Sequence, residues 1–144
     1  ETAIPYGAPA AVAGTPMDFS TPHLIGERID TDTDQLRWAR GYDHTYILDK
    51  ELGKLAIASR CSSPKTGIVM EVYTDQPGVQ LYTGNWMSGN LRGKHDHRYP
   101  ARAALCLETQ HYPDSPNKPE YPSTRLNPGE TFRSTTIFRF TLEA

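Results

Sequence analysis

The chain has 144 residues, 37% of them hydrophobic, which is enough for one domain with its own core. Its 15 basic and 17 acidic residues give a net charge of -2 with no basic stripe, which argues against nucleic acid as a partner. No apolar run approaches the roughly 20 residues of a membrane span, so we expect no membrane partner either. Two cysteines, Cys61 and Cys106, do not make a disulfide scaffold, and reduced thiols in a cytoplasmic protein are the simpler interpretation.

Proline and charge dominate the start of the chain, and β-strand signals dominate the rest. Residues 1–24 hold four prolines and predict an extended or looped arm. Residues 25–38 predict either a solvated loop or a short helix, with Thr31 or Asp32 as the N-cap. Strands are predicted at residues 46–48, 55–60, 68–74, 79–83, 103–110 and 131–141, with hairpin connections at 51–53 and 62–67. The pattern is that of an all-β fold of antiparallel strands, which suits a β-sandwich.

A single carboxylate, Glu108, lies in the middle of the predicted strand at 103–110. Alternation puts it on the same side as the small residues Ala104 and Cys106, whereas Leu105 and Leu107 fall on the other side. Small neighbours leave room above Glu108 for a ligand. The proline-rich segment that follows cannot continue the sheet. An ordinary solvent-facing glutamate on a half-exposed strand fits the same pattern.

Four segments of the chain together resemble the aldose 1-epimerases (galactose mutarotases). The sequence Cys106-Leu107-Glu108-Thr109-Gln110, followed by Pro113-Asp114-Ser115-Pro116-Asn117, is similar to the C-terminal signature of that family. Residues 12–26, the sequence Gly41-Tyr42-Asp43-His44 and residues 76–85 agree with it in order and spacing. Because these segments cover nearly the whole chain, the resemblance is far more specific than one short motif.

The same resemblance implies that a large part of the enzyme is missing from this chain. Family members are much longer, and the match begins in the middle of their pattern. Their general acid, a histidine, belongs to the N-terminal half, and none of the five histidines here lies in a segment like its motif. Residues 1–144 would therefore be the C-terminal portion of a single mutarotase-like β-sandwich domain, with 1–24 as an arm. The fold would be part of a supersandwich completed by the N-terminal half, which we expect as a second chain unless it is cleaved off or absent.

The resemblance also implies roles for three residues. Glu108 would be the base that acts on the anomeric O1, Asp43 would accept hydrogen bonds from sugar hydroxyls, and Gln80 would face the sugar cleft. Interconversion of α and β anomers needs two opposed proton-transfer groups and no metal or organic cofactor. The alternatives are a turn or capping role for Asp43 and a structural role for Gln80, which lies opposite Val79 and Leu81 on its strand.

One histidine cluster raises the question of a metal. His95 and His97 form an H-x-H pair, but two ligands do not make a zinc site, so we interpret residues 90–98 as a polar loop and expect no metal. The sequence leaves open whether the carboxylate oxygens of Asp43 bind a hard cation.

The resulting prediction is an isomerase, an aldose 1-epimerase for free hexoses such as galactose or glucose, complete only with its N-terminal half. A non-catalytic carbohydrate-binding β-sandwich, which keeps Asp43 and Gln80, is the first alternative. A hexose-6-phosphate 1-epimerase is the second. It needs a cationic clamp for the phosphate, whereas Arg133 and Arg139 lie on a predicted strand instead of converging in a loop. A purely structural β-domain is the third. Because a partial sandwich leaves sheet edges and an apolar face uncovered, we also expect the chain to be stable only with its complement.

Overall fold

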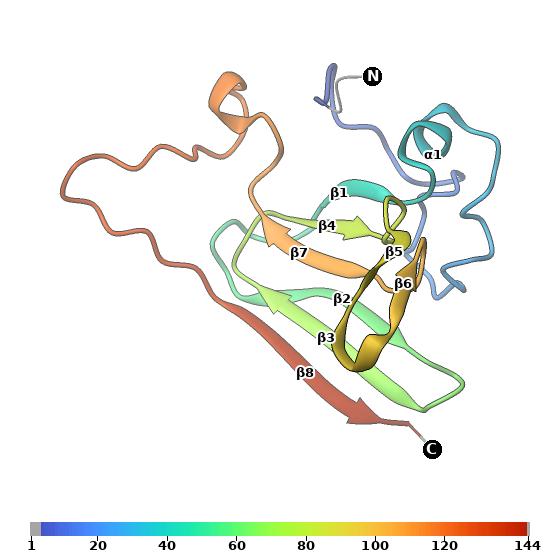
Figure 1. The fold of residues 1–144 in the computed structure, drawn as a ribbon. Helices are drawn as coiled ribbons and strands as arrows, with labels where there is room; N and C mark the ends of the chain where they lie inside the picture. The colour runs from blue at the N-terminus through green and yellow to red at the C-terminus, as the bar shows by residue number, and fades with distance from the viewer. Residues whose placement is uncertain (1–3, 144) are drawn as a thin grey trace. The chain divides into compact units, whose positions relative to one another are not determined.

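The computed structural model describes residues 4–143, and most of its regular structure is β-sheet. The elements are α1 (Asp34–Ala39), β1 (Asp43–Ile47), β2 (Ala56–Ser62), β3 (Ile68–Thr74), β4 (Gly78–Tyr82), β5 (Ser88–Arg92), the 3₁₀ turn η1 (Lys94–Asp96), β6 (Arg98–Pro100), β7 (Cys106–Gln110), the 3₁₀ turn η2 (Ser115–Asn117) and β8 (Thr136–Leu142). The strands form the sheets β1-β4-β7, β2-β3-β8 and β5-β6 (Figure 1). The pairs β2–β3, β3–β8 and β5–β6 are antiparallel, so the predicted fold class is confirmed.

The chain divides into two compact units. One comprises Glu1–His44 with Leu81–Cys106, and the other comprises Thr45–Gln80 with Leu107–Ala144. The first unit buries the apolar side chains of Ile29, Leu36, Tyr42 and Leu81, and the second buries Val69, Val72 and Val79 together with Thr74. Each unit therefore has a small core of its own.

Within the second unit, the side chains of β7 point alternately toward and away from the sheet β2-β3-β8. Thr109 on β7 lies with its Oγ1 2.6 Å from the Oγ1 of Thr136 on β8. Thr136 is in turn paired with Thr74 on β3, whose side chain is fully buried. The Thr109 side of β7 is therefore the inner side, and alternation puts Glu108 on the outer side.

The strand β8 is the edge of its sheet and carries an apolar row that nothing in the described chain covers fully. Its neighbour on one side is β3, and Figure 1 shows no strand beyond it. Phe138, Phe140 and Leu142 alternate onto one face and are 49%, 63% and 77% exposed. This is the open edge and apolar face expected of a partial sandwich, whereas dependence on a complement stays a prediction.

In the first unit, a buried polar network holds the chain where it passes from α1 into β1. The helix ends at Ala39 with Arg40 as its C-cap in left-handed backbone angles (φ 59°), and Gly41 follows with φ 142°. The Nδ2 of Asn85 donates to the carbonyl oxygens of Ala39 (2.9 Å) and Tyr42 (2.8 Å). The residues next to Asp43 are therefore fixed by hydrogen bonds to the backbone.

The arm predicted at the start of the chain has no helix or strand between residues 4 and 24, but its later part is anchored. The ring of Phe19 packs edge-on against Tyr42, with 5.2 Å between the ring centroids. The hydroxyl of Tyr42 donates to the carbonyl of Pro16 at 3.0 Å. Tyr42 is fully buried, so the arm covers part of the core of the first unit.

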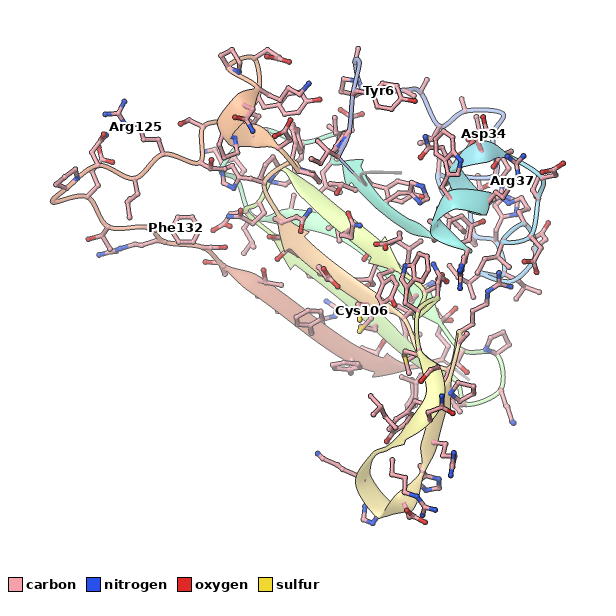
Figure 2. All side chains as sticks on the ribbon, turned by 45° about the horizontal axis from the view of Figure 1, so that its top comes forward. Tyr6, Asp34, Arg37, Cys106, Arg125 and Phe132 are labelled. Atoms are coloured by element: carbon pink, nitrogen blue, oxygen red, sulfur yellow. The ribbon has the colours of Figure 1, made fainter. Side chains whose placement is uncertain are left out.

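Several local predictions differ from the structure. The strand expected at 103–110 is β7, which begins only at Cys106, so Ala104 is not part of it. The connection at 51–53 is not a hairpin, because β1 and β2 belong to different sheets; the 62–67 connection between β2 and β3 is one. The helix N-cap is Thr33 instead of Thr31 or Asp32. The last strand begins at Thr136 instead of residue 131, since the N–H of Thr135 donates to the carboxylate of Asp75 (2.8 Å) before the ladder with β3 starts. Figure 2 shows Arg125 and Phe132 on the irregular segment that leads to this strand.

The interpretation of residues 90–98 as a loop holds for residues 93–97, whereas residues 90–92 belong to β5 and Arg98 to β6. The turn between the two strands of this β5–β6 ribbon places His95 and Asp96 in left-handed backbone conformations (φ 55° and 63°). Most side chains of the ribbon are exposed, so no apolar alternation marks its strands. Such a strand pair gives little signal in the sequence.

Candidate functional site

Glu108 occupies the centre of β7, on the outer side of the sheet. Its side chain is exposed, whereas Leu107 and Thr109 on either side of it are half-buried. Within residues 4–143, the Glu108 carboxylate forms no hydrogen bond or ion pair. A carboxylate without an internal partner is available to accept a proton from a ligand.

Gln80 lies on β4, the central strand of the same sheet. Val79 and Leu81 are buried, with 4% and 7% of their surface exposed, and Gln80 between them is half-buried on the opposite side. Its Oε1 accepts a hydrogen bond from the hydroxyl of Thr45 on β1. The Nε2 of Gln110 on β7 donates to the same hydroxyl, at 3.1 Å. Gln80, Thr45 and Gln110 therefore share one side of the sheet.

Glu108 lies on this side as well, because it precedes Gln110 by two positions on β7. Two residues of a strand span roughly 7 Å and point the same way. The second unit thus presents a free carboxylate beside a set of side chains held by hydrogen bonds. The Glu108 carboxylate and the hydrogen-bonded amide of Gln80 therefore lie on the same surface of the sheet.

Asp43 belongs to the first unit, at the start of β1. It is half-buried and precedes Thr45 by two positions, so alternation puts both side chains on one side of β1. Its backbone N–H donates to Nδ1 of His44 (3.0 Å), and Nε2 of His44 lies 3.2 Å from Oε1 of Gln35. Burial lowers the pKa of His44, which keeps the ring neutral, with Nδ1 as acceptor and Nε2 as donor. The His44 ring therefore fixes the backbone N–H of Asp43 by accepting its hydrogen bond.

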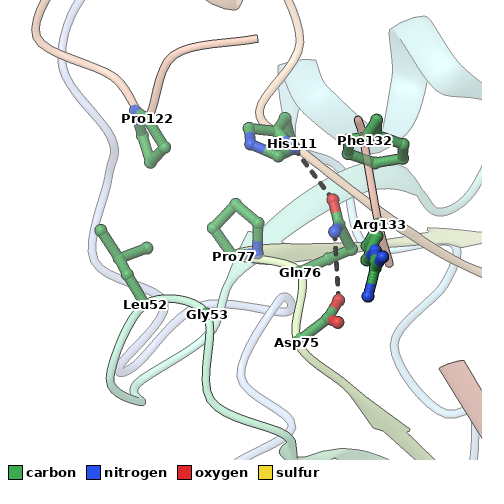
Figure 3. A pocket seen from close by; sticks show the side chains of 9 residues that line it. All are labelled: Leu52, Gly53, Asp75, Gln76, Pro77, His111, Pro122, Phe132 and Arg133. Carbon is green, nitrogen blue, oxygen red and sulfur yellow. Dashed lines mark hydrogen bonds between the residues drawn. The ribbon is translucent and has the colours of Figure 1, made fainter. Parts of the chain in front are cut away.

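A cavity of about 270 Å³ in the second unit contains none of these three residues (Figure 3). Its polar wall is a chain of internal hydrogen bonds: Nδ1 of His111 lies 2.9 Å from Oε1 of Gln76, and Nε2 of Gln76 donates to Oδ1 of Asp75 at 3.2 Å. Asp75 also accepts from the hydroxyl of Ser134, in the segment before β8. These bonds attach that segment to the end of β3, which is a structural function.

The described residues suggest neither a metal centre nor a membrane span. Among residues 4–143, no three His, Cys, Asp or Glu side chains are grouped so that they could hold a metal ion. His95 and His97 flank Asp96, which pairs with Arg92 at the tip of the β5–β6 ribbon. No helix in this part of the chain is long and apolar enough to cross a bilayer. Cys61 and Cys106 are both free thiols.

The sequence pattern of the aldose 1-epimerases matches residues 1–139. The chain belongs to the aldose 1-epimerase family. It is 42% identical to galactose mutarotase from Mus musculus over 142 residues and 36% identical to aldose 1-epimerase from Escherichia coli K12 over 146 residues. The fold is similar to the crystal structure of a GalM/aldose epimerase homologue from C. elegans, with a TM-score of 0.81 and 25% identity over 96% of this chain.

These relatives are much longer than the present sequence. The matches cover 99% of this chain but 40% of the mouse protein and 41% of the bacterial one, and the match to the C. elegans structure covers 40% of that chain. This aldose 1-epimerase sequence therefore corresponds to about two fifths of its relatives. The C-terminal position expected from the resemblance agrees with this partial coverage.

Two residues of the site were not singled out from the sequence. Gln110 lies two positions after Glu108, and its alternation with that residue was the only available signal. Thr45 follows Asp43 and His44 on β1 and carries no signal at all. Both are recognised only through their hydrogen bonds to each other and to Gln80.

Proposed function

We propose that the chain is the C-terminal portion of an aldose 1-epimerase that interconverts the α and β anomers of free hexoses such as galactose or glucose. The observation that carries the proposal is Glu108, an exposed carboxylate without a partner in the described chain, on the side of the sheet that also presents Gln80. Membership of the family and the names of the mouse and bacterial relatives support the reaction type.

The proposed reaction is a proton exchange at two oxygens of the sugar. Glu108 removes the proton from O1 while an acid protonates the ring oxygen O5, so that the C1–O5 bond breaks and a free aldehyde forms. After rotation about C1–C2, O5 attacks the other face of the aldehyde and returns its proton to the acid residue. Glu108 then gives its proton back to O1. No proton or electron is gained or lost overall, and each proton-transfer group contributes roughly 10²–10⁴-fold in rate.

The acid is not assigned to any residue of this chain. By resemblance it is a histidine of the N-terminal half, which we propose as a second part of the enzyme that must be present for turnover. Asp43, with two carboxylate oxygens, is proposed to accept hydrogen bonds from sugar hydroxyls.

The test is a mutarotation assay on freshly dissolved α-galactose, followed by polarimetry, with the chain joined to its N-terminal complement. We expect Glu108→Gln to lower turnover by at least roughly 100-fold, because the amide cannot take the O1 proton. Glu120→Gln is the matched control, since Glu120 is exposed and also forms no ion pair in the described chain. Near-normal turnover of Glu108→Gln would remove Glu108 from the role of base.

Native mass spectrometry of the purified protein addresses the complement directly. A second polypeptide that co-migrates with the 16.1 kDa chain supports a two-part enzyme. Galactose binding without turnover, by the chain alone or with its complement, would instead indicate a carbohydrate-binding protein.

The hexose-6-phosphate alternative gains no support from Arg133 and Arg139. The Nε of Arg139 lies 3.1 Å from the Glu71 carboxylate, with which it forms an ion pair. Arg133 lines the cavity beside Asp75, before β8 begins. Neither accompanies Glu108 on the outer side of β7. Loss of binding when a 6-phosphate is added to the sugar would exclude this function.

A further inference from the structure

The hydrogen bonds along the cavity of Figure 3 fix the side chain of Gln76 within the second unit. This residue is only 7% exposed. Its Nε2 donates to Oδ1 of Asp75 at 3.2 Å and to Oγ of Ser134 at 3.1 Å, and its Oε1 lies 2.9 Å from Nδ1 of His111. A turned amide would place its oxygen against the carboxylate, and both of these groups only accept. The orientation of the amide is therefore determined.

This orientation also determines which ring nitrogen of His111 carries a proton. The Oε1 of Gln76 only accepts, so the Nδ1 atom that faces it must be the donor. In a neutral imidazole one nitrogen is a donor and the other is an acceptor. Neutral His111 therefore has its lone pair on Nε2, which makes this atom a hydrogen-bond acceptor.

The Nε2 atom of His111 opens into the cavity. Within residues 4–143, the bond to Gln76 is the only hydrogen bond or ion pair of the ring. Nε2 is not a buried atom, and in Figure 3 it faces the space between Pro77 and Pro122. A ligand in the cavity can therefore donate a hydrogen bond to it.

A second polar group of the cavity has the opposite character. Arg133 lines the cavity and has no hydrogen bond or ion pair to any residue that the structure describes. Its guanidinium only donates, whereas Nε2 of His111 only accepts. A hydroxyl group does both, so a ligand with several hydroxyl groups matches the two side chains. The carboxylate of Asp75 in the same lining balances the positive charge of Arg133, so a neutral ligand fits better than an anion.

The size and the apolar surface of the cavity restrict this ligand further. The volume of about 270 Å³ is close to the lower limit of ligand pockets, roughly 300 Å³. Pro122 and Phe132 provide apolar surface, and Phe132 is 62% exposed. The C–H groups of a compact cyclic polyol pack against such surface, while its hydroxyl groups meet His111 and Arg133.

We propose that this cavity is a second ligand site, which binds a neutral polyol of monosaccharide size through Nε2 of His111 and the guanidinium of Arg133. The cavity contains none of Glu108, Gln80 and Asp43, so the inference does not rest on the proposed function.

The test is a titration of the protein, joined to its N-terminal complement, with myo-inositol. This neutral cyclic polyol has no anomeric carbon and cannot be converted by a mutarotase. Nitrogen-15 NMR of labelled histidines under mildly alkaline conditions reports the position of the proton on His111. We expect the Nδ1–H form, and a saturable shift of the Nε2 signal as inositol is added. An Nε2–H form, or a signal that inositol does not shift, would overturn the proposal.

Two substitutions remove the polar groups of the site one at a time. His111→Phe keeps a flat ring without the acceptor, and Arg133→Met keeps a long side chain without the donor. We expect each to raise the Kd for inositol roughly 3- to 10-fold in calorimetry, which is the effect of one ordinary hydrogen bond. Arg133 is exposed, so Arg133→Met tests the site even if His111→Phe destabilises the fold. An unchanged Kd in one variant removes that residue from the site, and an unchanged Kd in both overturns the proposal.

Two further variants serve as controls. His95→Phe makes the same replacement on the exposed turn of the β5–β6 ribbon and should leave the Kd for inositol unchanged. Glu108→Gln should also leave it unchanged, because Glu108 does not line the cavity. If Glu108→Gln weakens inositol binding as much as His111→Phe does, inositol binds on the Glu108 side of the sheet and the second site fails. Inositol binding by a wild-type protein without mutarotase activity would refute the proposed function alone.

Hydrogen exchange locates the bound ligand on the chain. Pro122 and Phe132 belong to the irregular segment between η2 and β8, so a bound polyol holds this segment against the connection between β3 and β4. Exchange of residues 123–131 should slow at saturating inositol in the wild type and not in His111→Phe. Exchange that stays the same in the wild type would show that inositol binds elsewhere, and the proposal would be wrong.

Discussion

Replacement of Asn85 tests how the backbone next to Asp43 is held in place. Asn85 is 6% exposed, and its amide makes three hydrogen bonds: Nδ2 donates to the carbonyls of Ala39 and Tyr42, and Oδ1 accepts from the Thr83 hydroxyl at 2.7 Å. In Asn85→Ala the Tyr42 carbonyl still accepts a hydrogen bond from the backbone N–H of Thr83, at 3.1 Å. The Ala39 carbonyl, at the end of α1, loses the donor that Asn85 supplies.

The expected loss of stability follows from these hydrogen bonds. The part-buried Ala39 carbonyl, left without its donor, costs roughly 1–3 kcal/mol, and the loss of the further bonds adds about 1 kcal/mol. We therefore expect Asn85→Ala to lower the free energy of unfolding by about 2–4 kcal/mol. Asn85→Asp has the same shape but turns carboxylate oxygens toward two carbonyls, so it should destabilise the protein at least as much.

Urea unfolding followed by tryptophan fluorescence measures the effect, with Trp38 and Trp86 as reporters in the first unit. Asn90→Ala is the control, because Asn90 is exposed on the β5–β6 ribbon. A cost below about 1 kcal/mol for Asn85→Ala, or one no larger than that of Asn90→Ala, would show that the network does not stabilise the start of β1.

Three further predictions concern other parts of the chain. His44 is half-buried, and desolvation holds its pKa below the usual 6.5, so the unfolded chain binds more protons than the folded protein just below that pH. The free energy of unfolding should therefore fall as the pH drops through this window, and His44→Gln should flatten the dependence. Alkylation should reach Cys106 before Cys61, because Cys106 is exposed while burial raises the pKa of the Cys61 thiol; mass mapping that finds equal rates would contradict this. The chain without its complement should self-associate, since Phe138, Phe140 and Leu142 are exposed on an edge strand; a monomer at all concentrations in sedimentation would refute that expectation.

The local pattern of the sequence located β4 to within one residue, since the predicted strand is 79–83, and β3 without error. It did not give the ends of the other two site strands, because the strand predicted at 46–48 misses Asp43 and Thr45 on β1 and the one at 103–110 begins three residues before β7. Alternation also places Glu108 and Gln80 opposite the apolar residues of their strands. This information is local, because successive side chains of any strand point to opposite sides.

Tertiary structure decided which strands are neighbours, and with them the surroundings of each residue. That β4 lies between β1 and β7, and that Thr45 and Gln110 meet beside Gln80, depends on contacts between residues 35 and 65 positions apart in the sequence. The β5–β6 ribbon was missed because its exposed side chains have no apolar alternation. Alternation determines which way a side chain points, whereas its partner is determined by long-range packing, which a local pattern does not contain.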